Sequence, residues 1–409
     1  MTSSAGWWSS APPQAKRALL GGMLGWMLDA FDVMLFALVL PAIISDLALT
    51  KAEAGLLGSV TLVAAAVGGV GFGWFADRFG RTRALMTSIA LYSVFTFACG
   101  FAATLTEFMI FRIFLGLGMG GEWTSGAALV SESWPSEHRG KALGMMQSGW
   151  AIGYGLAALV AGIVQPRFGW RAVFFAGIVP AFLTLWIQRR VHEPEIWTRT
   201  ARSARPSPGF GSVFRSGIGT ITVMLTLMNT CTLFAWWGFN LWLPSYLKAA
   251  PAQGGIGLTG EMASAFVVVM QIGMWFGYVT FGFVSDTMGR KRTYVVYLLA
   301  AAALLTVYVT VRVPVVLFFL GPFVAFAATG YFSGFGAVTA EIYPTSIRAT
   351  AQGFTYNVGR LASAAAPYLV GSLADTNGFG PALLICAAAF VLAAITWTWI
   401  PETKGRALA

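Results

Sequence analysis

Apolar stretches of about twenty residues recur along nearly the whole chain, and short polar segments separate them. A helix of that length can cross the hydrocarbon layer of a bilayer, which is roughly 30 Å thick. The pattern therefore predicts an all-α membrane protein with about twelve transmembrane helices. Their expected ranges are 18–42, 52–75, 84–102, 105–130, 142–165, 171–188, 217–244, 260–284, 294–311, 313–338, 351–373 and 379–399. An even number of spans would put both termini on one side of the membrane.

Composition narrows the class further. Of the 409 residues, 57% are hydrophobic and only 10% are charged, whereas about a quarter of the residues in ordinary soluble domains are charged. The net charge of +10 does not require a nucleic-acid partner, because most Lys and Arg residues fall in loops on one side of the predicted membrane. This bias predicts cytoplasmic termini. We expect a monomeric multi-pass protein of a plasma membrane or bacterial inner membrane.

The sequence contains few residues in patterns that would indicate catalysis, a metal site or a cofactor site. Cys99, Cys231 and Cys386 all lie in apolar runs, which indicates packing rather than disulfide bonds. Both histidines fall in predicted loops without a second ligand at metal spacing. The spans contain no recognisable pair of nucleophile and base, and no phosphate-binding loop ends in Lys-Ser or Lys-Thr. We therefore expect no enzymatic activity, no bound metal and no cofactor, with a proton gradient as the driving force.

Two loop sequences recur at a constant spacing of 209 positions. The segment GWFADRFGRTR matches GFVSDTMGRKR, and ESWPSEHRGKALG matches EIYPTSIRATAQG in the same register. The matched charged residues include Asp77, Arg81, Glu132 and Arg139 in the first half and Asp286, Arg290, Glu341 and Arg348 in the second. One register shared by two separate loops indicates an internal duplication.

The duplication predicts two six-helix bundles. The N-terminal bundle spans 1–188, a polar linker spans 189–216 and the C-terminal bundle spans 217–409. Transporters use such repeats so that the two halves can rock around a site near the bilayer midplane.

On these motifs the whole chain resembles the major facilitator superfamily, whose most specific sequence mark is the duplicated G-x-x-x-D-x-x-G-R-x-R loop. Within that superfamily, LDAFD, RIFLGLGMGGEW and SWPSEHRGKALG resemble the metabolite:proton symporters, especially the aromatic-acid and the sialate or lactate branches. The terminal PETKG resembles the ending of sugar porters, but their pattern of paired glutamines and tyrosines in span 7 is absent. The resemblance implies the major facilitator fold.

We expect the eight matched loop residues to act as a gate. An aspartate such as Asp77 can accept hydrogen bonds from arginines and helix N-termini, and this would latch the halves together at the cytoplasmic face when the carrier faces outward. In the alternative interpretation, the arginines of these loops only set membrane topology.

Four charged residues deep inside the predicted spans of the first half have no charged counterpart 209 positions later: Asp29, Asp32, Arg112 and Glu122. An ionised group inside a membrane helix is costly, so such residues usually face a cavity, have a partner or carry a proton. We interpret these four as the proton-coupling site. Asp32 and Arg112 are expected at similar heights, where they can pair. The alternatives are a purely structural Asp32–Arg112 pair and a packing role for Glu122 beside its small neighbours.

In the second half, Arg360 is the unmatched charge inside a predicted span, near the middle of span 11. A guanidinium suits a carboxylate because its planar fork donates two parallel hydrogen bonds. The aromatic-acid symporters and related organic anion transporters also carry an arginine in this span, which supports substrate binding. The alternative is an ion pair with an acid of the first half. Gln147, Asn240 and Tyr356 complete the expected substrate site, because spans 5, 7 and 11 line the cavity in the resembled fold.

The sequence thus predicts a secondary transporter that moves a small organic anion, such as an aromatic acid, lactate or sialate, together with protons by alternating access. One alternative is a porter for a neutral sugar or polyol, in which Arg360 would be structural. Another is a non-transporting membrane sensor, which would not need a duplicated gate.

Overall fold

The computed structural model describes residues 6–9, 11–134, 138–193, 213–214, 217–343 and 347–404; for residues 6, 7, 77, 139, 140, 340 and 348–350 only the backbone is described. Every regular element in these ranges is a helix, as predicted. In the first half the elements are α1 (Gly6–Ser9), α2 (Pro13–Asp46), α3 (Lys51–Phe79), α4 (Arg81–Cys99), α5 (Leu105–Ser133), α6 (Arg139–Phe175), η1 (Ala176–Ile178) and α7 (Ala181–Arg190).

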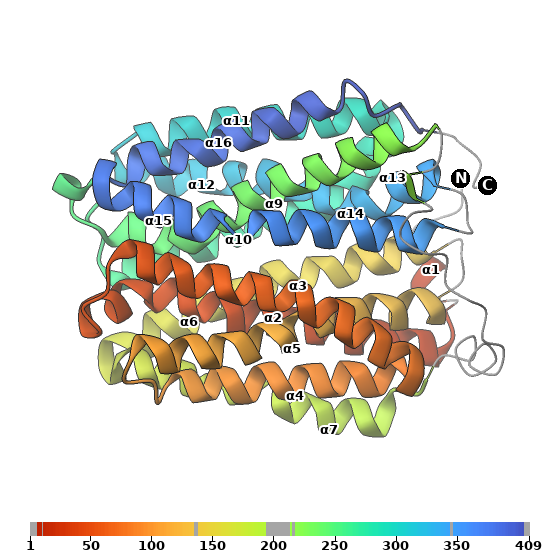
Figure 1. Ribbon diagram of the computed structural model, residues 1–409, viewed down its shortest axis with the longest axis horizontal. Coiled ribbons are helices and arrows are strands. Elements are labelled where there is room, and N and C mark those ends of the chain that lie inside the picture. Colours follow the sequence, from red (N-terminus) through yellow and green to blue (C-terminus); the bar gives the residue numbers. More distant parts are fainter. Residues whose placement is uncertain are drawn as a thin grey trace.

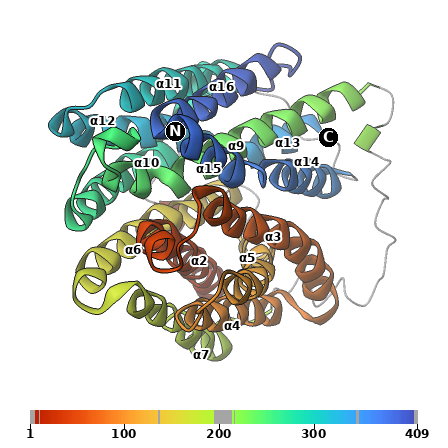
Figure 2. The same ribbon diagram turned by 60° about the vertical axis from the view of Figure 1, so that its left-hand side comes forward.

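The second half repeats this plan. Its elements are α9 (Gly219–Lys248), η3 (Pro251–Gln253), α10 (Gly260–Met288), α11 (Arg290–Thr310), α12 (Pro314–Thr329), η4 (Gly330–Gly334), α13 (Phe335–Ile342), α14 (Arg348–Ser363), α15 (Ala366–Asn377) and α16 (Phe379–Thr396). Figure 2 shows α2–α7 in one bundle and α9–α16 in a second bundle beside it. Most of the expected linker lies outside the described residues.

Nine helical stretches in the described ranges are long and apolar enough to cross a membrane. One of them, 141–190, holds two passes, because Gly169 turns the chain with a φ of 78°. α5 makes one more pass and is less apolar because it carries Arg112 and Glu122. α14 and α15 together make another pass, which is broken between them. Together these make the twelve passes that the sequence predicts.

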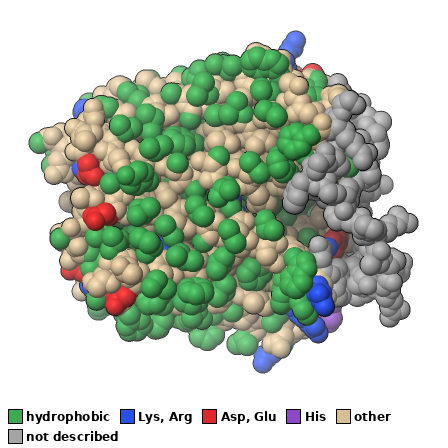
Figure 3. Space-filling view, viewed as in Figure 1, with side chains coloured by type: hydrophobic (Ala, Val, Ile, Leu, Met, Phe, Trp, Pro, Cys, Tyr) green, Lys and Arg blue, Asp and Glu red, His purple; other side chains and the backbone are tan. Residues whose placement is uncertain are grey.

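Apolar side chains cover most of the flank of the molecule in Figure 3, and charged side chains gather toward its two ends. Phe182, Phe283 and Phe319 are among the large hydrophobic residues whose side chains are exposed on the surface of the protein. Such an exposed apolar surface suits lipid contact. The three cysteines are free and buried, as expected.

The two ends of the molecule differ. α1 and the last described residues lie at one end (Figure 1), which we call the terminal side; the opposite end is the far side. On the far side Thr50 begins α3 with a capping box to Glu53, and Thr104 and Thr259 cap α5 and α10. These side-chain caps supply acceptors for N–H groups that have no partner inside the helix.

Three expected spans are interrupted. The expected span 351–373 is split into α14 and α15, because Pro367 lies in the first turn of α15 and cannot donate a hydrogen bond back to α14. The span 313–338 contains the 3-10 turn η4 between α12 and α13, and the span 171–188 contains η1 between the end of α6 and α7. The break between α14 and α15 follows Arg360 by three residues, near the middle of that pass.

Candidate functional site

The unmatched charged residues of the predicted spans are all buried. Asp29, Asp32, Glu122, Arg112 and Arg360 each have at most 3% of their surface exposed. Asp29 lies at the centre of the group, because the charges of Asp32, Glu122 and Arg360 all act on it through space.

Arg360 has no ion pair or side-chain hydrogen bond to any residue in the described part of the chain, although it is 3% exposed. The charge of Arg360 acts through space on Asp29, which lies outside ion-pair distance. Because it lies in the last turn of α14, the carbonyl groups at that helix end favour its positive charge. The hydrogen-bonding fork of this guanidinium therefore has no partner among the described residues.

Asp32 and Arg112 do not form the expected pair. Within the described part of the chain, neither carboxylate oxygen of Asp32 has a hydrogen-bond partner, and neither do Nε and Nη1 of Arg112; all four atoms are buried. The Arg112 guanidinium instead lies 4.1 Å from the centre of the Phe36 ring, one helical turn beyond Asp32. Arg112 also lines a cavity of about 10 Å³ between the bundles, together with Thr61 and Trp237.

Asp32 faces the interior of the first bundle. A methyl group at Gly177 would stand 3.3 Å from its Oδ1, so the carboxylate lies against η1 rather than against the second bundle. The two aspartates thus have different surroundings, because Asp29 alone is close to the cation of the second half.

Glu122 packs against α2. A methyl group at Gly25 would stand 2.6 Å from its Oε1, so the absence of a side chain at Gly25 makes room for the carboxylate. Both oxygens of Glu122 are buried without a hydrogen-bond partner. The neighbouring glycines Gly116 and Gly120 bring α5 into close contact with the α3 backbone. Close packing therefore explains the small residues of this helix. It does not provide hydrogen-bond partners for the carboxylate of Glu122.

The expected polar residues have different environments. Tyr356 stacks on Trp123 across the two halves, with ring centres 4.9 Å apart, and it lies near both Arg360 and Asp29. Asn240 uses its amide to donate to the Trp236 carbonyl at 3.0 Å, so its side chain is partly committed to its own helix. Gln147 is half-buried and has no hydrogen bond among the described residues.

Contacts between the halves close the far side. Lys51 Nζ lies 3.3 Å from Asp375 Oδ1, and the same carboxylate accepts the Ala52 N–H at 3.0 Å. Asp375 of the second half therefore caps the start of α3 in the first half. Lys248 Nζ donates to the Leu38 carbonyl at 2.6 Å. In the described ranges, hydrogen bonds and ring contacts between the halves run from this end to about the level of Trp123 and Tyr356.

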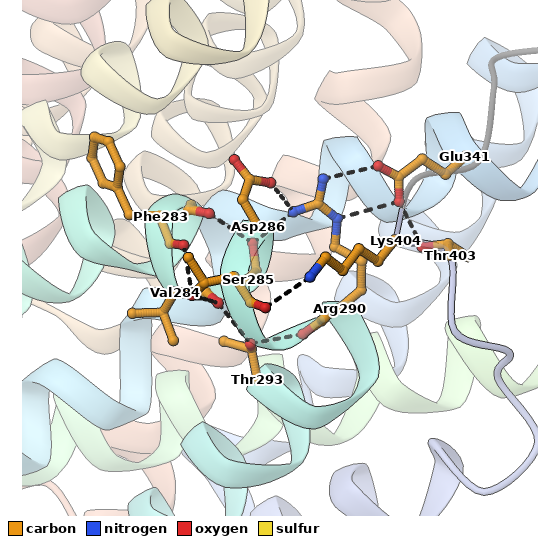
Figure 4. Close-up of polar contacts among 12 residues, drawn as sticks. Phe283, Val284, Ser285, Asp286, Arg290, Thr293, Glu341, Thr403 and Lys404 are labelled. Carbon is orange, nitrogen blue, oxygen red and sulfur yellow. Dashed lines mark hydrogen bonds and ion pairs between the residues drawn. The ribbon is translucent and has the colours of Figure 1, made fainter. Parts of the chain in front are cut away.

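The matched loop residues on the terminal side form two separate clusters. Figure 4 shows the Arg290 guanidinium between Asp286 and Glu341, with Nη2 of Arg290 2.9 Å from Glu341 Oε1. The equivalent atoms of Arg81 and Glu132 lie 3.0 Å apart. Each of these pairs stays within its own half. The side chains of Asp77, Arg139 and Arg348 lie outside the described residues, so the expected latch between the halves remains a prediction.

A third matched pair, which the sequence reasoning missed, completes these clusters. Glu193 accepts the backbone N–H groups of Arg81 and Thr82 at 2.7 and 3.0 Å, and Glu402 accepts those of Arg290 and Lys291 at 2.8 and 3.2 Å. Burial would raise the pKa of Glu402, but the backbone N–H groups of Lys404, Arg290, Thr403 and Lys291 outweigh it and hold that pKa below its ordinary value.

Glu193 and Glu402 are also 209 positions apart, so the register of the duplication could have identified them. Glu402 belongs to the PETKG segment, and its capping of α11 gives that segment a structural role without any sugar.

Comparison with known proteins agrees with this architecture. The family model of the Major Facilitator Superfamily matches residues 22–254 and 249–409. A probable 4-methylmuconolactone transporter of Cupriavidus pinatubonensis is 34% identical over 98% of this chain and 94% of its own length. A cis,cis-muconate transport protein of Acinetobacter baylyi is 32% identical over 93% of this chain and 92% of its own. The crystal structure of a D-xylose-proton symporter aligns with a TM-score of 0.77 at 22% identity, over 97% of this chain and 100% of that one.

The duplicated loops, the two bundles and these matches lead to one assignment. The chain is a multi-pass membrane transporter rather than an enzyme, and it belongs to the Major Facilitator Superfamily.

Proposed function

We propose that this transporter is a symporter that imports a small organic anion together with protons by alternating access. It works as a monomer in the inner membrane of a bacterium, with both termini in the cytoplasm, and it uses the proton gradient instead of a cofactor. The terminal side is then the cytoplasmic side, and the far side faces outward.

The single observation that carries the anion assignment is the state of Arg360. A buried guanidinium without a carboxylate partner is costly, and this one lies beside the helix break near the middle of its pass. A substrate carboxylate would supply both the missing charge and the acceptors for the planar fork. The alternative of an ion pair with an acid of the first half loses support, because none of the three acids is within ion-pair distance.

The relatives support an organic acid as the substrate class. The names of the two transporters cited above give 4-methylmuconolactone and cis,cis-muconate as the compounds that those proteins carry. The D-xylose symporter supports the fold alone, because its identity to this chain is only 22%.

Asp29 is the best candidate for the transported proton. It is 1% exposed, its Oδ2 has no hydrogen-bond partner, and the field of Arg360 acts on it. A substrate anion at Arg360 would partly neutralise the cation that stabilises the ionised form of Asp29. Substrate binding would therefore favour protonation of Asp29, which is the coupling that a symporter needs. Arg112, Asp32 and Glu122 complete the proton-coupling group, with Asp32 in a lesser role.

Alternating access is supported by the contacts of the far side. The Lys51–Asp375 pair and the Lys248–Leu38 contact join the two halves there. The ion pairs Arg81–Glu132 and Arg290–Glu341 each join two residues of the same half. From the contacts of the far side we infer an inward-facing state, in which the outer contacts between the halves are formed.

Transport by the purified protein in liposomes tests the proposal. An imposed pH gradient, acid outside, should drive accumulation of an organic acid by the normal protein. Asp29→Asn should abolish this accumulation and retain exchange of substrate across the membrane, since exchange requires no net release of a proton. Asp46→Asn is the matched control, because Asp46 pairs with Arg171 within the first bundle, away from the site. Accumulation that persists in Asp29→Asn would remove Asp29 from the coupling mechanism.

A further inference from the structure

Four tryptophans meet where α2, α6 and α9 come together. Trp26 and Trp150 have ring centres 4.6 Å apart, Trp150 lies 5.5 Å from Trp236, and Trp236 lies 4.8 Å from Trp237. α2 and α6 belong to the first half and α9 to the second. The tryptophan cluster therefore spans the interface whose rearrangement opens and closes a transporter.

Three of these indoles lack a hydrogen-bond acceptor among the residues that the structure describes. The Nε1 atoms of Trp26, Trp150 and Trp236 are buried without a partner, and the side chains are only 5%, 3% and 4% exposed. A buried indole N–H normally finds an acceptor, because leaving it unpaired is unfavourable. Trp242 shows the usual arrangement, since its Nε1 donates to the Pro367 carbonyl at 2.9 Å.

An unpaired indole alone does not mark a binding site. Trp397 also lacks an acceptor, and it stacks on Tyr294 within the second bundle. The tryptophan cluster differs because it holds three unpaired N–H groups together at the interface of the halves. It also adjoins the charged group, since Trp26 lies three residues before Asp29 on α2, about 4.5 Å along the helix and about 60° around it.

We propose that Trp26, Trp150 and Trp236 form a second substrate subsite, which binds a planar unsaturated part of the substrate and a second hydrogen-bond acceptor on it. This rests on the proposed function, in which Arg360 holds the carboxylate. A planar π system can stack on indole rings, whereas a saturated ring lacks that interaction. An oxygen or ring nitrogen remote from the carboxylate would supply the acceptor that the indole N–H groups lack. The substrate class is thus a conjugated or aromatic acid with a second acceptor.

Three probe acids test both parts of this inference by thermal-shift titration, because a ligand that binds the folded protein raises its apparent stability. Benzoate should bind about threefold to tenfold more tightly than cyclohexanecarboxylate, which has the same charge and a similar size without the π system. Nicotinate, whose ring nitrogen adds an acceptor, should bind about tenfold more tightly than benzoate. If the normal protein fails to prefer nicotinate over both other acids, the inference is overturned.

Conservative variants then assign the effect to residues. Trp150→Phe and Trp236→Phe keep an aromatic ring and remove the N–H, so each should reduce the preference for nicotinate over benzoate by about threefold to tenfold. Trp397→Phe is the matched control, since it removes an unpaired N–H away from the site. An unchanged preference in both cluster variants would overturn the assignment.

The methyl esters of the same acids separate this inference from the proposed function. If the acids bind, the esters do not, and the tryptophan variants have no effect, the anion assignment stands and the second subsite is wrong. If esters and acids bind equally well, the anion assignment itself is wrong.

Discussion

Gly25 leaves room for the carboxylate of Glu122. A methyl group there would stand 2.6 Å from Glu122 Oε1, which is closer than van der Waals contact. Gly25→Ala should therefore displace the Glu122 carboxylate and cost about 1–3 kcal/mol of stability, as overpacking usually does. The measurement is the thermal stability of the purified protein together with its rate of proton-driven uptake.

Gly144→Ala provides the control for this prediction. Gly144 is also helical, but no atom lies within 4 Å of the position that its methyl group would take. The substitution should be neutral or slightly stabilising, because alanine favours helix more than glycine does. Equal stability and uptake in Gly25→Ala and Gly144→Ala would show that Glu122 does not depend on the space at Gly25.

Some residues of the candidate site could be identified from the sequence alone. Buried charge in a membrane helix is rare enough that Asp29, Glu122 and Arg360 could be selected from the sequence alone. The pairing of Asp32 with Arg112 was predicted from their heights along two helices, and it is wrong. Height does not fix how each helix is rotated, and Phe36 occupies the position beside the guanidinium.

At the scale of helices, carboxylates cap helix starts on the terminal side of both halves. Because the pKa of Glu402 is held below its ordinary value, its contribution to stability is present above the pKa of an unfolded Glu, about 4.3, and is lost as the pH falls through the lower folded value. Glu402→Gln should lower the melting temperature at pH 7, and the difference from the normal protein should shrink below about pH 4.

Glu261→Gln is the control for the cap prediction. Glu261 is exposed in the first turn of α10 and has no hydrogen bond in the described part of the chain. It should change the melting temperature much less than Glu402→Gln at pH 7. Equal effects of the two substitutions would indicate general surface charge rather than capping.

The contact of α15 with the start of α3 makes a second prediction at this scale. Asp375→Asn weakens the bond between Lys51 and α15, so it should destabilise the state closed on the far side. In a Ser59→Cys background, a membrane-impermeant maleimide added outside should then label the cysteine faster, because Ser59 lies on the same contact and accepts the Tyr368 N–H.

The ion pair of Asp46 with Arg171 offers the matched control, since it lies at the same end but within the first bundle. Asp46→Asn in the same background should leave the labelling rate unchanged. If Asp375→Asn labels no faster than Asp46→Asn, the contact does not govern opening of the far side.

Helix positions were largely predictable, because long apolar runs and loop punctuation determine them. The break in the eleventh pass was not predicted, although Pro367 signals it. The tryptophan cluster could not be predicted, since aromatic residues are common in membrane helices for packing and for interfacial belts. Only the folded arrangement brings rings from α2, α6 and α9 together.

At the scale of the whole molecule, the charge count predicts the coupling ratio. The three buried carboxyl groups of Asp29, Asp32 and Glu122 are balanced by only two buried guanidinium groups, those of Arg112 and Arg360. If all five groups were ionised, one negative charge would remain in excess. Because a buried uncompensated charge is costly, one of the acids should carry a proton. A monocarboxylate adds one negative charge, so its binding should take up about one further proton. Its affinity should accordingly fall as the pH rises, by up to about tenfold per pH unit.

Calorimetry measures this uptake directly. The binding enthalpy is determined at one pH in two buffers with different ionisation enthalpies, and the difference gives the number of protons exchanged. The cluster predicts about one proton per monocarboxylate in the normal protein and a much smaller uptake in Asp29→Asn. Binding without proton uptake in the normal protein would contradict coupling at this site.

We propose that Arg360 binds the carboxylate of the substrate. Comparing the binding affinities of an acid and its methyl ester tests this most directly. The strongest binder of a carboxylate panel and its ester are titrated against the normal protein, Arg360→Lys and Arg112→Lys. Arg112 is the matched control, because it is a second buried guanidinium without a hydrogen-bonded carboxylate.

Arg360→Lys keeps the charge and loses the two-pronged hydrogen bonding, so it should weaken binding of the acid by about 1.5–3 kcal/mol and reduce its advantage over the ester. Arg112→Lys should leave the advantage of the acid over the ester intact. An unchanged preference for the acid in Arg360→Lys and Arg360→Ala would contradict the claim and make Arg360 a structural residue.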